Sequence, residues 1–190
     1  MRRSVAAGLF VKHLAHDDIV VCGLGSTSRA WREQRAPHLT YYASDPMGLA
    51  PALALGLALA RPDRRVVLLE GDGDLAMNLG VLVTIGGAAP ANLRLAVFIN
   101  DRYETGGGQP LPNAGQIAYV YVAAGAGWPW TGEAHDEAQA ERLVPALLGR
   151  PGLAFLSLHV DAEASPYPAD AGPAAQSEDK AEFQRRLAGG

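Results

Sequence analysis

The sequence predicts an α/β fold, a three-layer α/β/α sandwich around a mostly parallel six-stranded sheet. First, short β-rich runs alternate with helical patterns, at the spacing of a parallel sheet with crossover helices. Second, several runs are apolar on both faces, such as VVLLE at 66–70 and LAVFI at 95–99, as strands covered on both sides are. Third, the loops that follow the strands are rich in Gly, Ser, Asp and Asn. Ligands of such sheets bind beyond the carboxyl ends of the strands.

The elements follow from these patterns and from turn residues between them. The predicted strands are Asp18–Cys22, Leu39–Tyr42, Arg65–Glu70, Leu93–Ile99 and Leu153–Val160, with a weaker sixth at Gly127–Thr131 that Pro129 interrupts. The predicted helices are Arg2–Ala15, Ser28–Gln34, Met47–Arg61, Leu75–Ala88, Gly115–Ala124 and Ala134–Leu148. Residues 1–160 form one domain in this interpretation. Residues 161–190 form a tail with one short helix, Ser177–Leu187, for which Ser177 is a plausible N-cap.

Composition excludes several classes of function. The net charge of −4 gives no electrostatic reason to expect nucleic acid or an anionic membrane as a partner. Cys22 is the single cysteine, so no disulfide within the chain and no cysteine-based zinc site is expected. The most apolar run, Gly48–Ala60, is shorter than the ~20 residues of a membrane span. We expect a cytoplasmic protein that does not bind membranes.

One motif carries the chemistry. Gly71-Asp72-Gly73 ends a predicted strand, and Asn100 ends the next one. One helix and one strand fill residues 74–99, so Asp72 and Asn100 are expected side by side at one edge of the sheet. Glycines allow the backbone to approach a bulky anion closely, and a carboxylate with a carboxamide oxygen suits Mg²⁺. An ordinary glycine turn followed by a strand-ending Asn is the alternative.

The motif resembles the diphosphate–Mg²⁺ signature of the thiamine-diphosphate enzymes. The similarity extends over YYASDPMGLAPALALGLALARPDRRVVLLEGDGDLAMNLG, residues 41–80. It implies thiamine diphosphate and Mg²⁺ as cofactors of the domain at 1–160, with Asp72 and Asn100 as side-chain ligands of the metal and the carbonyl of Arg102 as a third. The cofactor-binding residues that the resemblance implies are Gly25, Ser26, Thr27, Met47, Gly48, Gly71, Asp72, Gly73, Asp74, Asn100 and Arg102.

Two parts of this set also have a purely structural interpretation. In the family, a large apolar residue before a glycine props the cofactor into a bent shape, a position that Met47 and Gly48 match; Met47 as core filler at a helix start is the alternative. The family uses the loop Gly25-Ser26-Thr27 for the diphosphate. The alternative is a simple N-cap for the helix at 28–34.

The loop NDRYETGGGQP, residues 100–110, stands where these enzymes carry a loop that closes over the site. It resembles the segment of phosphonopyruvate and sulfopyruvate decarboxylases, as do GLGSTSRAW and GDGDLAMNLG; a flexible surface loop is the alternative. Three residues depart from the family pattern. Asp74 stands where relatives usually have Ser or Ala; it is a plausible N-cap and a like charge near the diphosphate. Asp45, with Pro46, replaces the small residues often found before the large apolar residue, and Asp101 replaces a frequent second Asn.

Thiamine catalysis in this family needs a Glu that hydrogen-bonds the cofactor's pyrimidine, and that Glu comes from a pyrimidine-binding domain. One domain accounts for this chain, so we expect the Glu from a partner subunit and assign no catalytic residue here. The histidines show no metal-ligand spacing, and Glu104 is a candidate polar contact in the glycine loop.

The expected function is a two-component decarboxylase of a small 2-oxoacid, within a homo- or hetero-oligomer. A thiamine-dependent carboligase or oxidoreductase subunit is one rival, because the cofactor does not fix the reaction. A non-catalytic nucleotide- or phosphate-binding module is another, although GLGSTS does not complete G-x-G-x-x-G. A chain that has lost activity and supports a partner is a third.

Overall fold

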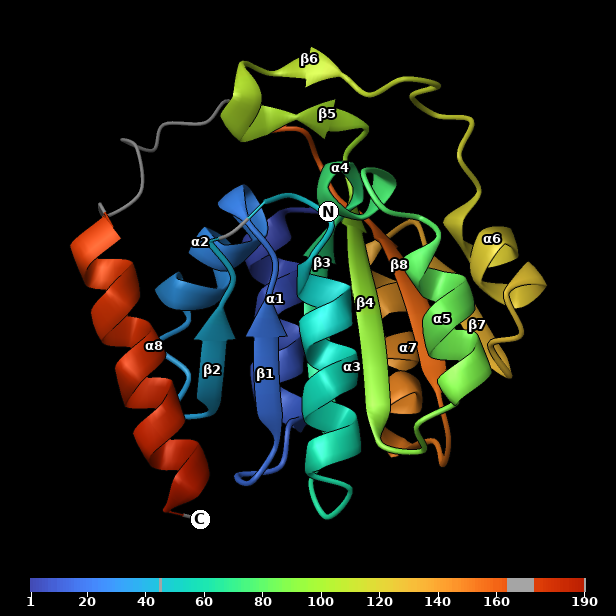
Figure 1. Ribbon diagram of the computed structural model, residues 1–190. Coiled ribbons are helices and arrows are strands. Elements are labelled where there is room, and N and C mark those ends of the chain that lie inside the picture. Colours follow the sequence, from blue (N-terminus) through green and yellow to red (C-terminus); the bar gives the residue numbers. More distant parts are fainter. Residues whose placement is uncertain (45, 164–172, 190) are drawn as a thin grey trace.

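The computed structural model describes residues 1–44, 46–163 and 173–189, so Asp45 lies outside the described residues. Its centre is a six-stranded sheet in which every neighbouring pair is parallel, in the order β2-β1-β3-β4-β8-β7 (Figure 1). The strands are β1 (Ile19–Cys22), β2 (Leu39–Tyr42), β3 (Val66–Gly71), β4 (Leu93–Ile99), β7 (Trp130–Ala134) and β8 (Ala154–His159). The predicted six-stranded α/β fold is confirmed.

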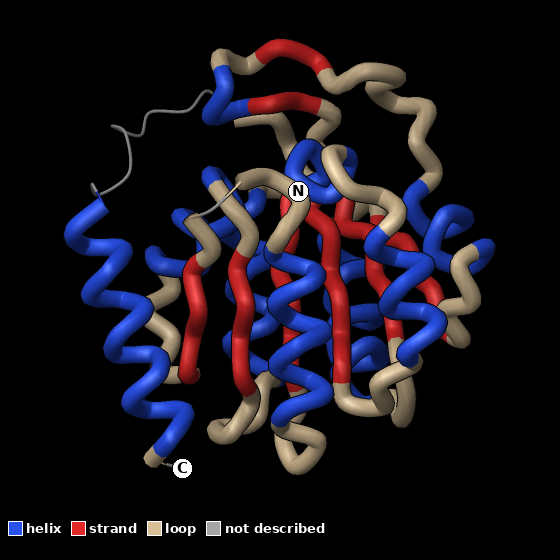
Figure 2. The backbone as a smooth tube through the Cα atoms, in the orientation of Figure 1, coloured by secondary structure: helices blue, strands red, loops and turns tan. Residues whose placement is uncertain are grey.

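Helices cover both faces of the sheet and make three layers (Figure 2). One face carries α3 (Ala50–Ala60), α5 (Val81–Ala88) and α6 (Tyr119–Gly125), and the other carries α1 (Arg3–His13), α2 (Gly25–Glu33) and α7 (Glu137–Gly149). Successive residues of a strand pack on opposite faces of the sheet. Leu68 lies in the core beneath α3, α5 and α6, and Leu69 lies in the core beneath α1, α2 and α7. Both cores are apolar, which explains why the central strands read as continuous hydrophobic runs.

The topology places a crevice between β1 and β3. The chain leaves β1 into α2 on one face of the sheet, whereas it leaves β3 toward α5 on the opposite face. The loops after these two neighbouring strands therefore diverge, which is the switch point at which open α/β sheets bind ligands. The loop that includes Gly23 and the turn at Asp72 flank this point.

Several helices have bounds that differ from the predicted ones, and two of these differences have clear local reasons. The single helix predicted at Leu75–Ala88 is two helices, α4 (Asp72–Ala76) and α5, separated at residues 77–80. The helix predicted at Ala134–Leu148 begins at Glu137, because Ala134 ends β7 and the carboxylate of Asp136 caps the helix by accepting from the Gln139 N–H. Pro129 lies just before β7 and does not interrupt it.

The tail helix packs on the edge of the sheet. It begins at Pro173 and not at Ser177, and extends as α8 (Pro173–Ala188) along β2. Phe183 is buried and meets Tyr41 edge to face at 5.3 Å. The sheet edge at β2 is thereby covered, which blocks pairing with another strand. No helix in the described part of the chain is long and apolar enough to cross a bilayer.

A small antiparallel hairpin lies above the carboxyl ends of the strands. It pairs β5 (Arg102–Tyr103) with β6 (Gln109–Pro110), and the 3₁₀ turn η1 (Glu104–Gly106) joins them (Figure 1). The sequence predicted a loop here and not this pairing. We call residues 101–111 the lid segment.

Candidate functional site

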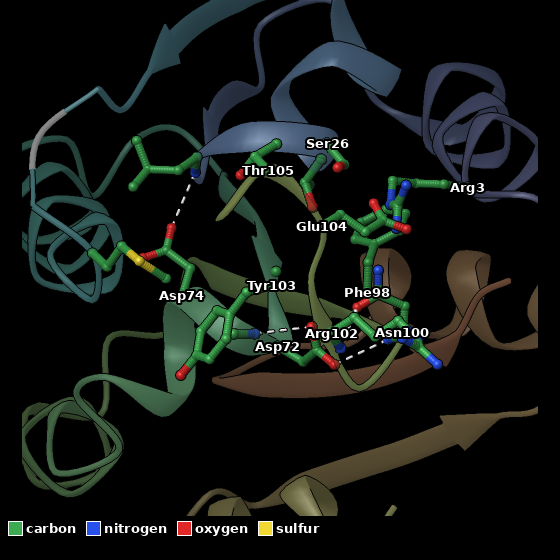
Figure 3. Close-up of a pocket in the computed structure, with 15 residues that line it drawn as sticks. Arg3, Ser26, Asp72, Asp74, Phe98, Asn100, Arg102, Tyr103, Glu104 and Thr105 are labelled. Atoms are coloured by element: carbon green, nitrogen blue, oxygen red, sulfur yellow. Dashed lines mark hydrogen bonds and ion pairs between the residues drawn. The ribbon is translucent and has the colours of Figure 1, made fainter. Parts of the chain in front are cut away.

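A pocket at the switch point gathers the sequence-predicted residues. Its lining includes most of the predicted cofactor-binding set, namely Ser26, Thr27, Met47, Gly71, Asp72, Gly73, Asp74, Asn100 and Arg102. Gly25 and Gly48 lie directly beside these residues in the chain but do not line the pocket. The loops after β1, β3 and β4 and the segment before α3 therefore converge as the strand order requires (Figure 3).

Asp72 is held by backbone donors from two strand ends. Its side chain is buried, Oδ1 accepts from the Gly73 N–H at 2.8 Å, and Oδ2 accepts from Asn100 at 3.0 Å and Asp101 at 2.6 Å. Burial raises the pKa of Asp72 to about 6, although the three N–H groups oppose that shift. No ion pair to Asp72 is found among the described residues. An ionised carboxylate that accepts only these three hydrogen bonds still has a lone pair with which to bind a cation.

The turn after β4 has a conformation that suits its residues. Asp101 has a φ of +59°, a left-handed conformation that Asn and Asp adopt more easily than other side chains. The Asp101 carboxylate accepts from the Gly115 N–H, and the Asn100 carboxamide oxygen accepts from the Arg102 N–H at 3.0 Å. The departure from the family pattern at Asp101 is thus compatible with the turn.

The loop after β1 enters α2 directly at Gly25, whose φ is +66°. Ser26 and Thr27 lie in the first turn of the helix, and no side chain caps it. The alternative that these residues are an N-cap for a helix at 28–34 is therefore wrong. The unpaired amides of this first turn and the helix dipole favour an anion.

Asp74 connects three segments of the site. It lies inside α4, so the prediction of an N-cap role is wrong. One carboxylate oxygen accepts from the Leu24 N–H at 3.0 Å (dashed line at Asp74 in Figure 3). The other oxygen accepts from the Gly48 N–H. The Asn78 side-chain amide donates to the Gly48 carbonyl at 3.0 Å. Asp74 and Asn78 therefore fix the backbone beside Met47.

Met47 is not core filler. Its exposed fraction is 38%, it lines the pocket, and α3 begins only at Ala50. Gly48 has a φ of +85°, and a Cβ there would come within 2.7 Å of the Asn78 side chain. The glycine is required for this turn, which presents the Met47 side chain to the pocket.

The lid segment is folded onto the site. Tyr103 and Leu111 occupy the space that a Cβ on Gly73 would fill, at 2.9 and 3.2 Å. Glu104 forms an ion pair with Arg3 at 2.9 Å in which both side chains are almost fully buried, and it also accepts from the Glu163 N–H. Burial raises the pKa of Glu104, but hydrogen bonds from Ser26 and Arg3 outweigh burial and lower it. The lid is tied to α1 and α2.

Sequence reasoning missed Arg3 and Tyr103, which line the pocket with Leu24, Phe98 and Thr105. Arg3 begins α1, far along the chain from the motif, and only the packing of α1 beside α2 brings it here. The sequence did contain one indication of a basic partner. Glu104 is an acid in the glycine loop, and if that loop folds over the site the buried carboxylate needs a cation beside it.

The arrangement offers an anionic oxygen site beside an anion-binding helix start. The Asp72 carboxylate lies at the ends of β3 and β4, and the first turn of α2 lies across the same pocket. A divalent cation that binds phosphate oxygens needs oxygen ligands from the protein, and the phosphate groups need an anion-binding helix start. A sequence profile described as the C-terminal TPP-binding domain of thiamine pyrophosphate enzymes matches residues 22–157. The chain belongs to this family. Its cofactor is thiamine diphosphate, the same molecule as thiamine pyrophosphate.

Relatives of this thiamine pyrophosphate enzyme domain include decarboxylases. The chain is 43% identical over 93 residues to the sulfopyruvate decarboxylase subunit beta of Methanothermobacter thermautotrophicus, which covers 49% of this chain and 50% of that subunit. It is 36% identical over 126 residues to the phosphonopyruvate decarboxylase of Streptomyces viridochromogenes, covering 65% of this chain and 31% of that enzyme. The match thus spans about half the length of the first relative and less of the second.

A solved structure confirms the fold of the family in this chain. The benzoylformate decarboxylase of Polynucleobacter necessarius superimposes with a TM-score of 0.77 over 88% of this chain and 34% of that enzyme. Sequence identity in this superposition is 18%. The arrangement of strands and helices is therefore retained where most side chains differ.

Proposed function

We propose that the chain is the cofactor-holding subunit of a two-component 2-oxoacid decarboxylase, which acts with a pyrimidine-binding partner subunit. The substrate is a small 2-oxoacid of the sulfopyruvate or phosphonopyruvate type. The relatives support this choice, because sulfopyruvate decarboxylase beta subunits and phosphonopyruvate decarboxylases both resemble the chain. The single observation that carries the proposal is the buried Asp72 carboxylate at the ends of β3 and β4, which no basic side chain of the described residues pairs with.

The metal-binding side of the site fits Mg²⁺. Asp72 and Asn100 supply oxygen ligands, and the carbonyl of Arg102 is the third that we assign. The backbone N–H groups around Asp72 orient its carboxylate before any ion arrives. A dication offsets the cost of keeping this carboxylate charged in a buried place, which burial otherwise imposes.

The diphosphate side fits the start of α2. Ser26 and Thr27 line the pocket, and the first-turn amides beside them have no partners inside the helix. Gly25 gives the backbone a turn that brings these amides to the pocket. We assign Gly71 and Gly73 to the close approach of backbone and anion, after Tyr103 has moved from its place over Gly73.

Met47 and Gly48 hold the middle of the cofactor in our proposal. The turn that presents Met47 is fixed from below by Asp74 and Asn78. A large, adaptable apolar side chain in that position suits contact with an aromatic ring system. Asp74 is thus a positioning residue, and its charge is already engaged by two backbone N–H groups.

Bound thiamine diphosphate supplies the electron sink for loss of CO₂. The described carboxylates in the pocket lining all have other tasks: Asp72 faces the metal position, Asp74 holds two loops, and Glu104 is paired with Arg3. None of them is available to hydrogen-bond the pyrimidine ring of the cofactor. We therefore assign the activating Glu to the partner subunit.

Titration calorimetry of the chain tests the cofactor site. Thiamine diphosphate with Mg²⁺ is expected to bind, NAD is expected not to bind, and Asp72→Asn is expected to remove the thiamine diphosphate signal. Binding of NAD in preference to thiamine diphosphate would support the nucleotide-binding module instead.

A second experiment tests the reaction. The chain is combined with a pyrimidine-binding chain from the same genome, and release of CO₂ from sulfopyruvate and from phosphonopyruvate is measured. The proposal expects release that requires both chains. Formation of a carbon–carbon bond between two pyruvate molecules, without net aldehyde release, would identify a carboligase.

A further inference from the structure

Two histidines and a glutamate lie close together at the β7 edge of the sheet, opposite the edge formed by β2. The Nε2 atom of His159 lies 2.8 Å from Oε1 of Glu133, and Nε2 of His135 lies 3.7 Å from Oε2 of the same carboxylate. One potential ligand atom from each of the three residues lies within 4.8 Å of the others. Glu133 and His135 are close in the sequence, but helix α7 separates them from His159 along the chain, so the group is not visible before the chain folds.

The register of β7 and β8 creates the cluster. Ala134 pairs with Leu158, so the next residues along the two strands, His135 and His159, lie across from one another. Their rings stack with centroids 4.2 Å apart and an interplanar angle of 23°. Glu133 is two residues before His135 and therefore shares its face of the sheet.

The face is also defined by the core. Ala134 and Leu158 belong to the core beneath α7, so the residues that alternate with them, Glu133 and His159, face the opposite side. There the three side chains are partly open to solvent, with exposed fractions of 33% for Glu133, 34% for His159 and 59% for His135. An ion could reach them without any change of the fold.

The backbone at His135 is fixed by the start of α7. Its N–H donates to the Gln139 side-chain oxygen at 2.9 Å, while the Gln139 N–H donates to Asp136 at 2.7 Å. This reciprocal pair of hydrogen bonds resembles a capping box, which restrains the chain just before a helix. His135 therefore stands on a restrained backbone although its side chain is exposed.

We infer that Glu133, His135 and His159 form a binding site for a divalent transition-metal ion, with Zn²⁺ as the best match. Two imidazoles and one carboxylate are ligands that Zn²⁺ takes, and such a set leaves a fourth position for water. With Zn–ligand bonds of ~2.1 Å, tetrahedral ligand atoms lie roughly 3.4 Å apart. The distances from the two carboxylate oxygens of Glu133 to His159 and His135, 2.8 and 3.7 Å, lie on either side of that value, and the three ligand atoms all lie within 4.8 Å of one another.

This site is separate from the cofactor pocket. Asp72 and Asn100 lie at the ends of β3 and β4, whereas Glu133 and His159 belong to β7 and β8, His135 directly follows β7, and none of the three lines the pocket. Hard oxygen ligands suit Mg²⁺, and imidazoles suit a transition metal. The two sites are therefore expected to differ in the ion they select, and the inference does not depend on the proposed reaction.

Metal titration of the full chain tests the site. The tag-free protein is freed of metal with a chelator, dialysed and titrated with Zn²⁺ in competition with a chromophoric chelator; Co²⁺ serves as a visible-absorbance probe of the coordination. One Zn²⁺ per chain is expected to bind. Glu133→Gln, which keeps the side-chain shape, and His159→Ala are each expected to abolish stoichiometric binding.

Matched variants separate the site from other binding. His13→Ala and His16→Ala remove exposed histidines elsewhere and are expected to keep full binding. Thermal unfolding without metal shows whether each variant is folded. Absence of saturable binding, a stoichiometry other than one per chain, or binding that survives both Glu133→Gln and His159→Ala in folded protein overturns the inference.

Discussion

The backbone N–H of Asn100 donates to Oδ2 of Asp72 over 3.0 Å, joining the ends of two neighbouring strands through one buried carboxylate. The pairing of β3 with β4 brings the turns together, and burial then makes the carboxylate hard to ionise without a cation. The same contact that organises the turn thus prepares a site for a metal ion and the anion it carries.

Replacing Asp72 tests this relationship. Asp72→Asn is expected to abolish the thermal stabilisation that Mg²⁺ and thiamine diphosphate give together. At 100 times the dissociation constant that stabilisation amounts to about 2.7 kcal/mol, or about 5–10 °C for a chain of this size. Differential scanning fluorimetry with and without both ligands measures it.

The matched control for this prediction is Asp63→Asn. Asp63 is an exposed acid paired with Arg61 at the opposite end of the sheet, so its replacement should leave the ligand-dependent shift intact. An undiminished shift in Asp72→Asn would contradict the metal assignment.

The Arg3–Glu104 ion pair is expected to hold the lid segment closed. Arg3→Met leaves the buried Glu104 charge without a cation, and Glu104→Gln leaves Arg3 with only the more distant carboxylate of Glu163, at 3.9 Å. Each variant should therefore cost about 3–5 kcal/mol of unfolding free energy. The double variant should cost clearly less than the sum of the two. Urea denaturation gives the energies, and hydrogen exchange at residues 101–111 reports release of the lid.

An exposed ion pair supplies the comparison for the lid. Arg185 and Glu182 form an i,i+3 pair on α8 that is largely open to solvent, and Arg185→Met should cost no more than about 1 kcal/mol. Additive losses at Arg3 and Glu104, with unchanged exchange in the lid, would show that the pair does not restrain this segment.

The sequence was sufficient for the sheet and for the centre of the site. Apolar runs defined β2 and β4 to the residue, and the rule that parallel strand ends converge placed Asp72 next to Asn100. Such inferences succeed because strand burial and strand order depend on patterns within one segment or between consecutive ones.

The parts that failed depend on contacts between distant segments. Asp74 resembles an N-cap in sequence, but its partners are the N–H groups of Leu24 and Gly48. His135 was assigned to a helix, whereas it directly follows β7, and this hid its place beside Glu133 and the stacking of its ring on His159. Local sequence patterns predict structure least well in turns and at strand ends that contain Pro or Gly.

Two adjacent glycines in α5 give opposite predictions. A Cβ on Gly86 would lie 2.0 Å from the Ala126 carbonyl oxygen, so Gly86→Ala must push α6 away and should cost about 1–3 kcal/mol or more. A Cβ on Gly87 meets nothing within 4 Å, so Gly87→Ala should stabilise by up to about 1 kcal/mol through helix propensity. Thermal and urea unfolding of the pair measure both.

The Gly86 variant also reports on the site. Tyr119 begins α6 and its hydroxyl donates to the Asp72 carbonyl at 3.1 Å, so displacing α6 should weaken thiamine diphosphate binding as well as stability. Equal stability of the two alanine variants would show that α5 and α6 are not in contact at Gly86.

Glu70 supplies a prediction for pH dependence. It is fully buried, and a Cβ on Gly23 would lie 1.8 Å from its carboxyl oxygen, so nothing larger than glycine fits there. Burial first, and the nearby Asp74 carboxylate second, raise the pKa of Glu70 well above its usual value. The folded protein therefore holds a proton that the unfolded chain releases at lower pH.

The sign of the effect follows from this difference. Below the pKa of Glu70 in the unfolded chain both states are protonated and the side chain contributes no pH dependence. Above it the unfolded state binds fewer protons, so stability falls as pH rises, by up to about 1.4 kcal/mol per pH unit until the folded pKa is reached. Glu70→Gln keeps the shape and removes the proton, so its stability relative to the wild type should increase with pH.

Urea denaturation of the wild type and Glu70→Gln from pH 5 to pH 8 measures this trend. Glu141→Gln, at an exposed position on α7, is the control and should follow the wild type throughout. A stability difference that stays constant across this range would mean that Glu70 does not hold its proton in the folded state.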